Sequence, residues 1–348
     1  MVLWHDTYKA LVQAMALRGK LTVPRMLRFL LSAGIIALLV VFARKVDWAA
    51  SWAAIRNSNR SLVALAAVIN IASLAFKGVR WWIFIRPVAP APIGLAMRAT
   101  IAGAGLNNVL IANGGDAARV VFVTRATGSS SAKILASLAV ERLFDVAVYV
   151  LVLAVAAFLL PLPFDVTAWR LPAAAGLVVM FVLGAYLIRR PESKPQQEAT
   201  VAVASADAPT VLQRVRSYVS RFMSGVSTLS TGPRFAGAMA LSLLAWAGQI
   251  ACYHVAAIAA HFPIPLWGTV AAFLAVNMAL VIRATPGNVG FFQLMYAVTA
   301  VSFGLKRDEA VGVALLIQAL QTIPITLLGI GLAPEFVFRK KSRTAQPA

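Results

Sequence analysis

Long apolar runs separated by shorter polar connections dominate this chain. Six runs of about 16 to 26 residues stand out, and about 20 residues of helix cross the roughly 30 Å hydrocarbon layer of a bilayer. We therefore predict an all-α polytopic integral membrane protein with about six spanning helices. The predicted spans lie within residues 27–42, 62–76, 146–160, 171–188, 235–260 and 311–332.

Two further apolar stretches are interrupted by glycine, proline and polar residues. One leads into Gly114 and Gly115, and the other into Pro286, Gly287 and, three residues later, Gly290. Such breaks at corresponding places of two halves are typical of inverted-repeat transporters, where broken segments line the substrate site. A shift of 175 residues aligns the two breaks. We predict that residues 94–112 and 266–282 begin two re-entrant helical hairpins that enter from opposite sides.

Composition agrees with a membrane protein, because 60% of the residues are hydrophobic, only 13% are charged and the mean hydropathy is +0.81. Lys and Arg outnumber Asp and Glu by 32 to 12. The basic residues gather in connecting segments, as the positive-inside rule requires of cytoplasmic loops. The chain has no RNA-recognition or zinc-finger pattern, so we expect no nucleic-acid partner.

Charge also predicts how the chain is divided. Residues 189–234 hold seven Lys or Arg, whereas 161–169 and 261–268 hold none, which places both termini in the cytoplasm of a cell bounded by this inner membrane. Four basic residues in segment 44–60 disagree, because they fall on the outer side. We expect an amphipathic N-terminus (1–26), a first membrane half (27–190), a linker with an interfacial amphipathic helix or a solvent-side connector helix (191–233), a second half (234–336) and a basic tail (337–348).

The strongest chemical signal is the segment Glu141-Arg142-Leu143-Phe144-Asp145, which lies deep within the helix expected from 132 to 160. Charged side chains at such depth cost at least about 2.5 kcal/mol each, so they pair or face a wet cavity. Arg142 and Asp145 can pair, whereas Glu141 and Asp145 repel each other unless a cation joins them. The candidate cations are Arg119, Arg98 and Arg283. The network is either purely structural or also lines a substrate cavity.

Gly114, Gly115 and Asp116 together with Arg119 suit an anionic head group, because glycine lets backbone N–H groups approach and a guanidinium binds phosphate bidentately. The alternative is a plain turn with a capping carboxylate. Asn288 and Gln293 either satisfy broken backbone or contact a ligand. The candidate substrate-binding residues are therefore Asp116, Arg119, Glu141, Arg142, Asp145, Arg283, Asn288 and Gln293.

We expect neither a metal nor another cofactor. The single cysteine, Cys252, excludes a disulfide framework, and the three histidines have no ligand spacing. No nucleotide-binding loop or nucleophile elbow is present. A gradient or simple scrambling would therefore drive any transport.

Three motifs in order, around Gly115, around Glu141 and around Gly287, make the chain similar to a known family. From about residue 25 to 335 it resembles the flippase-like family named after the membrane portion of lysylphosphatidylglycerol synthase, particularly its stand-alone bacterial members, some of them hopanoid-associated. The resemblance implies handling of polar or anionic lipids. It does not imply synthase activity, because no soluble aminoacyl-transferase domain fits here. Gln293 stands where many members have Glu.

Motifs and resemblance together predict a non-enzymatic lipid transporter or flippase. It would bind or move a phospholipid, glycolipid or hopanoid across the inner membrane. The first alternative is a non-transporting partner that scaffolds a lipid-modifying or glycosyl-transferring enzyme. The second is a membrane transferase acting through Asp116 and Glu141, although no nucleotide or metal site accompanies these carboxylates.

Overall fold

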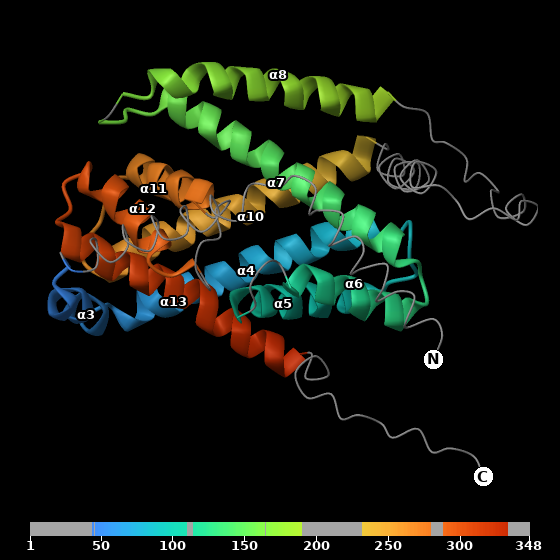
Figure 1. The fold of residues 1–348 in the computed structure, drawn as a ribbon, viewed down its shortest axis with the longest axis horizontal. Coiled ribbons are helices and arrows are strands. Elements are labelled where there is room, and N and C mark those ends of the chain that lie inside the picture. Colours follow the sequence, from blue (N-terminus) through green and yellow to red (C-terminus); the bar gives the residue numbers. More distant parts are fainter. Residues whose placement is uncertain are drawn as a thin grey trace, which may run out of the picture. The chain divides into compact units, whose positions relative to one another are not determined.

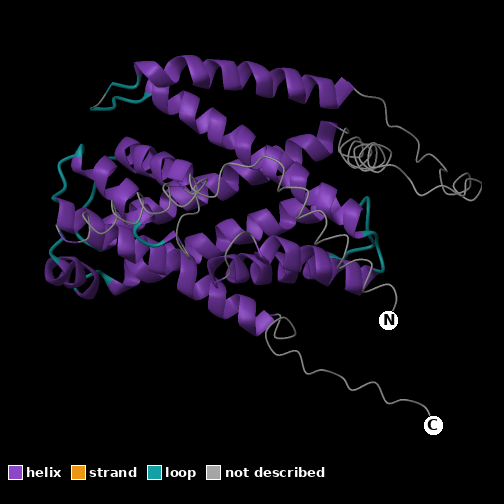
Figure 2. Ribbon diagram, viewed as in Figure 1, coloured by secondary structure: helices purple, strands orange, loops and turns teal. Residues whose placement is uncertain are grey.

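A computed structural model describes residue 44 and residues 46–109, 114–163, 165–189, 232–279 and 288–332. Apart from residues 44 and 46, all of these lie in one compact unit, Asp47–Ala348. The described part of this unit contains α-helices and no strands (Figure 2). The predicted span 27–42, most of the linker 191–233 and the basic tail lie outside the described residues.

The helices follow one another along the chain as labelled in Figure 1. Their bounds are α3 (Trp48–Arg56), α4 (Arg60–Ile85), α5 (Ile93–Val109), α6 (Gly114–Thr127), α7 (Ser131–Leu159), α8 (Thr167–Arg189), α10 (Gly232–Ala259), α11 (Leu266–Ala279), α12 (Phe291–Val301) and α13 (Arg307–Leu332).

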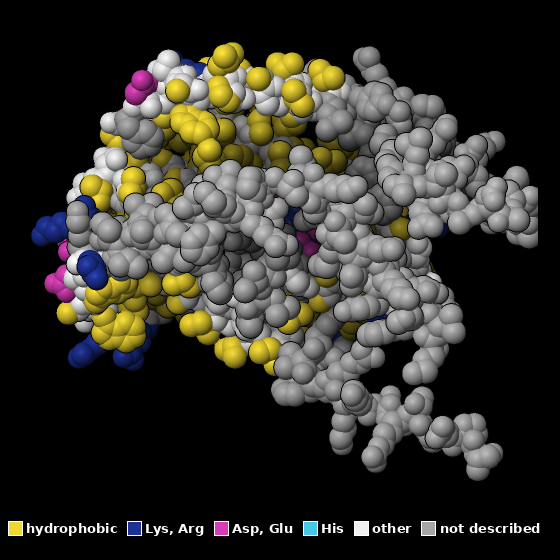
Figure 3. Space-filling view, in the orientation of Figure 1, with side chains coloured by type: hydrophobic (Ala, Val, Ile, Leu, Met, Phe, Trp, Pro, Cys, Tyr) yellow, Lys and Arg dark blue, Asp and Glu magenta, His cyan; other side chains and the backbone are white. Residues whose placement is uncertain are grey.

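Four helices, α4, α7, α10 and α13, are 26 to 29 residues long. Each is long and apolar enough to cross a membrane, which confirms the polytopic all-α prediction. A fifth predicted span coincides with α8, which has 23 residues. Figure 3 shows charged side chains gathered where α3 and the start of α13 lie, with hydrophobic side chains along the helices.

Four shorter helices form two pairs. In the first pair α5 packs on α6, and in the second α11 packs on α12. The longest of them, α5, has 17 residues and so measures about 25 Å, less than the hydrocarbon thickness. Both pairs agree with the predicted re-entrant hairpins. The tips of the hairpins, residues 110–113 and 280–287, lie outside the described residues.

The described helices repeat in order and in packing. Each helix from α10 to α13 begins 172 to 177 residues after its counterpart from α4 to α7. Within each group neighbouring helices pack together, and the first also packs on the last. Between the groups, α7 packs on α11 and its counterpart α13 packs on α5. This reciprocity is what an internal repeat requires.

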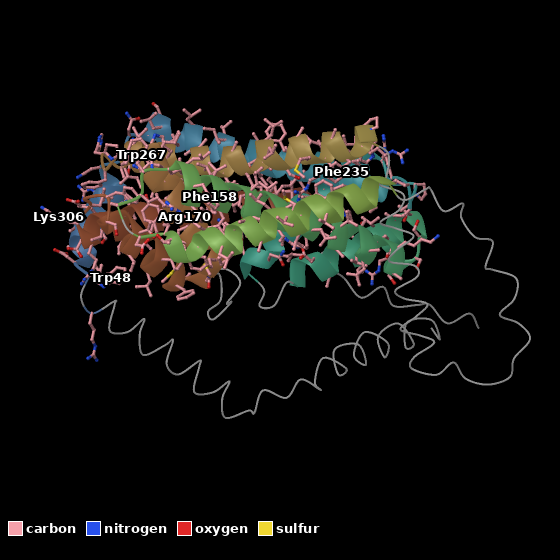
Figure 4. The ribbon with its side chains drawn as sticks, turned by 90° about the horizontal axis from the view of Figure 1, so that it is seen from above. Trp48, Phe158, Arg170, Phe235, Trp267 and Lys306 are labelled. Carbon is pink, nitrogen blue, oxygen red and sulfur yellow. The ribbon has the colours of Figure 1, made fainter. Side chains whose placement is uncertain are left out.

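Corresponding helices run in opposite directions (Figure 1). The start of α4 meets the end of α10, because Asn59 N donates to Ala259 O at 2.8 Å. Further along, Ser73 Oγ donates to Ala245 O at 2.6 Å. In Figure 4 the labelled Trp48, Trp267 and Lys306 lie at one end of the helices, and Phe235 lies towards the other. The halves are therefore inverted relative to each other, as the sequence predicts.

Proline inside α13 creates a polar contact between the halves. Pro324 has no backbone N–H, so the carbonyl of Leu320 lacks its helical donor. Asn70 Nδ2 of α4 donates to this carbonyl at 3.0 Å. Gln249 of α10 donates to Asn70 at 3.1 Å and accepts from Gln321 of α13 at 3.1 Å. We call Asn70, Gln249 and Gln321 the amide cluster.

The first hairpin closes through a glycine contact. A Cβ atom on Gly115 of α6 would lie 1.8 Å from the carbonyl oxygen of Gly103 on α5. A Cβ on Gly103 would in turn lie 2.5 Å from the Arg119 side chain. Because the nearest atom to Gly115 is backbone, no side-chain rotation can relieve the clash. The spacing of α5 and α6 therefore requires glycine at this position.

We predict that Gly115→Ala separates α5 from α6 and lowers the unfolding midpoint of the purified protein in mild detergent. Gly94→Ala is the matched control, because a Cβ there meets nothing within 4 Å and alanine favours a helix by about 1 kcal/mol over glycine. Thermal unfolding followed by size-exclusion chromatography measures both. Equal midpoints for the two variants would contradict the close contact.

Candidate functional site

Three helices bring charged side chains together beside the first hairpin. Asp116 lies in the first turn of α6, and Arg119 follows one turn later. Glu141 lies ten residues into α7, about 15 Å along its axis. The third helix is α4, which contributes Arg80, a residue that the sequence analysis did not single out. Each helix thus places its charges within the part expected to cross the membrane.

Arg80 supplies the cation that Glu141 and Asp145 require. Its Nη2 lies 3.3 Å from Glu141 Oε1, and its Nη1 lies 2.9 Å from Asp145 Oδ1. One guanidinium therefore joins two carboxylates that occupy the same side of α7 and would otherwise repel each other. The sequence correctly predicts a joining cation but names the wrong candidates for this position.

The remaining pairs close a ring of alternating charge. Arg119 lies 2.9 Å from Glu141 and 3.8 Å from Asp116, and Arg142 contacts both Asp116 and Asp145. The predicted Arg142–Asp145 pair is confirmed at 3.7 Å. We call these six residues the charge ring. In order around the ring they are Arg80, Glu141, Arg119, Asp116, Arg142 and Asp145.

One arc of the ring is held from several sides. The Arg80 side chain is fully buried and also donates to Ser242 of α10 at 2.8 Å. Arg119 donates to Thr100 of α5 at 3.2 Å, and its guanidinium lies 4.1 Å from the ring centre of Trp81. A guanidinium that is paired, hydrogen-bonded and stacked is fixed in place. This arc ties the first hairpin to α4, α7 and α10.

The opposite arc is open. The Arg142 side chain is 53% exposed, whereas those of Asp116 and Asp145 are 20% and 19% exposed. Figure 3 shows acidic atoms reaching the surface near the middle of one face. An exposed guanidinium midway along a spanning helix is costly unless polar matter meets it. The open arc is therefore the place where the ring can meet a ligand.

The glycine motif has a different role from the one predicted. Gly115 N donates to Asn107 Oδ1 at 2.8 Å, and Asn107 Nδ2 donates to Asp116 at 3.3 Å. The N–H of Gly115 is thus used within the hairpin and does not point at an anion. Gly114 begins α6. The predicted backbone cradle at Gly115 is wrong, and this glycine instead permits the close approach of the two helices.

Asn288 and Gln293 do not join the charge ring. Gly290, with a φ of +88°, donates its N–H to Gln293 Oε1 at 2.6 Å, and Gln293 donates to Gln318 of α13. Asn288 is buried with a φ of +56°, and neither of its amide atoms has a hydrogen-bond partner. The second hairpin therefore carries neutral amides where the first carries charges.

Two other candidates did not enter the ring, and three predicted residues cannot be placed. Arg98 is exposed, donates to Leu332 O at 3.0 Å and lies over Phe122. Arg283, Pro286 and Gly287 lie outside the described residues. Among the predicted cations, only Arg119 and Arg142 are therefore seen in the network.

We predict that Arg80→Met lowers the free energy of unfolding much more than Arg142→Met. Loss of Arg80 leaves two buried carboxylates without their shared cation, which costs about 3–5 kcal/mol. Loss of Arg142 costs about 1 kcal/mol or less, because that side chain is half exposed. Denaturant titration of both variants in the same detergent measures the difference. Equal losses would show that the two arcs do not differ in burial energy.

Comparison with known families agrees with this arrangement. The family model described as the lysylphosphatidylglycerol synthase TM region matches residues 26–329. The match includes both hairpins and every residue of the charge ring, and it confirms the resemblance found in the sequence. A search of curated proteins finds no match.

Proposed function

This chain belongs to the lysylphosphatidylglycerol synthase TM-region family, and we propose that it binds a lipid head group at the charge ring and moves the lipid between leaflets. The observation that carries this proposal is the half-exposed Arg142, held by two carboxylates on a membrane-spanning helix. A ring built only for stability would bury all six members. Here one arc is left accessible.

The ring allows a head group to enter without leaving a charge unpaired. Arg142 contacts Asp116 on α6 and Asp145 on α7. A head-group phosphate can replace one carboxylate on the guanidinium, because both are planar-face acceptors of its two N–H donors. The displaced carboxylate keeps a second partner, since Asp116 also faces Arg119 and Asp145 also faces Arg80.

The inverted halves supply the route between leaflets. In inverted-repeat transporters the site lies where the repeats meet and is exposed to one side at a time. Arg80 lies five residues before the end of α4, about 8 Å along the axis. Arg86, Lys133 and Arg234 are near this end, so the positive-inside rule makes it cytoplasmic. The open arc would receive lipid from the cytoplasmic leaflet of the inner membrane.

We predict that Arg142→Gln slows lipid translocation at least tenfold in reconstituted vesicles while the protein still folds. A tenfold loss corresponds to about 1.4 kcal/mol, within the range for a charge-assisted hydrogen bond. Acyl-labelled phospholipids and a membrane-impermeant quencher report how fast lipid leaves one leaflet. The matched control is Arg170→Gln, which removes an exposed arginine of α8 that bonds Ala157 O and lies over Phe158 (Figure 4).

Two results would contradict the proposal. If Arg142→Gln and Arg170→Gln both translocate lipid at the wild-type rate, the charge ring is not the site. If the wild-type protein moves no lipid but co-purifies with a lipid-modifying or glycosyl-transferring enzyme, the chain acts as a non-transporting partner.

A further inference from the structure

A seventh charged side chain lies beside the ring. Lys77 is three residues before Arg80 on α4, and residues three apart lie on the same side of a helix. Its ammonium interacts electrostatically with Asp145, Arg80 and Arg142. Unlike the ring arginines, it has no carboxylate within ion-pair distance in the described part of the chain. Lys77 is partly buried.

Lys77 therefore leaves the site with an excess positive charge. The three carboxylates of the ring are shared by its three arginines, so the ring itself is neutral. Adding Lys77 gives the seven side chains a net charge of about +1. An uncompensated charge at membrane depth is costly and marks a functional site by default. A bound group with one negative charge would neutralise it.

Snorkelling towards water is a weaker explanation for Lys77. The residue lies eight positions before the end of α4, about 12 Å along the helix axis. That distance exceeds the length of a lysine stem, so the ammonium cannot reach the polar end of the helix alone. It can reach polar matter only beside the ring, where Arg142 is exposed.

We propose that Lys77 and Arg142 together bind the phosphodiester of an anionic lipid, so that the preferred substrate carries one net negative charge. This inference rests on the proposed lipid-binding function. Arg142 offers a forked pair of N–H donors for two phosphate oxygens, and Lys77 adds a compact point charge. A phosphodiester whose head group also carries an ammonium would place a cation beside these two cations. Such zwitterionic or net-cationic lipids are disfavoured.

The test compares three labelled lipids in vesicles containing the full-length protein. They are phosphatidylglycerol, phosphatidylethanolamine and a neutral glycosyl diacylglycerol. We predict that the wild-type protein moves phosphatidylglycerol fastest. Lys77→Gln should lose about tenfold of that rate, as expected for one charge-assisted contact. Lys77→Arg keeps the charge and should retain the preference. Lys77 has no ion pair to lose, so both variants should unfold at the wild-type midpoint.

Binding separates this inference from the proposed translocation. Native mass spectrometry measures how much phosphatidylglycerol each variant retains, with soluble glycerophosphoglycerol as competitor. Retention that depends on Lys77 supports the anion site even if no lipid is moved, in which case only translocation fails. Equal movement of all three lipids by the wild type, or unchanged selectivity in Lys77→Gln, would overturn the inference. Displacement by the soluble competitor at equal concentration would show a site for water-soluble anions and would also overturn it.

Discussion

Charges within a membrane must be paired, and this constraint organises the first half of the molecule. The charge ring satisfies it by giving each of its six members two partners of opposite sign. Because the members come from α4, α6 and α7, the ring also fixes the first hairpin against the spanning helices. Breaking one contact strands a charge where water cannot solvate it. The glycine contact between α5 and α6 matters for the same reason, since it leaves room for the Arg119 side chain.

The two halves share a scaffold but not a chemistry. Their helices repeat in length, order and packing, yet a shift of 175 residues puts Leu316 where the first half has Glu141. Without that carboxylate the second half cannot form an equivalent ring. Its polar contacts are neutral instead: Gln293 with Gln318, and the amide cluster at the Pro324 interruption. Packing surfaces tolerate divergence in a repeat, whereas a ring of charges depends on each of its members.

The sequence predicts the repeat and the long helices well, because both follow from hydropathy and broken segments. It also predicts the Arg142–Asp145 pair, since spacing on one helix is local information. It misses Arg80 because the apolar run of α4 appears to stop at Phe76, before Lys77, although the helix continues to Ile85. Partners on different helices depend on tertiary packing. The same limit applies to Gly115, whose close contact with Gly103 on another helix cannot be inferred from the residue type.

A transporter that relies on ion pairs faces opposing demands, because closed pairs stabilise the fold and open ones bind substrate. The ring meets both through graded burial. Arg80, Arg119 and Glu141 have side chains at most 5% exposed and keep the helices together, whereas Arg142 is 53% exposed. Exchange of a carboxylate for a phosphate at Arg142 conserves the number of pairs, so it needs little of the energy that breaking the buried arc would require. Binding can therefore be reversible at one arc while the other keeps the hairpin in place.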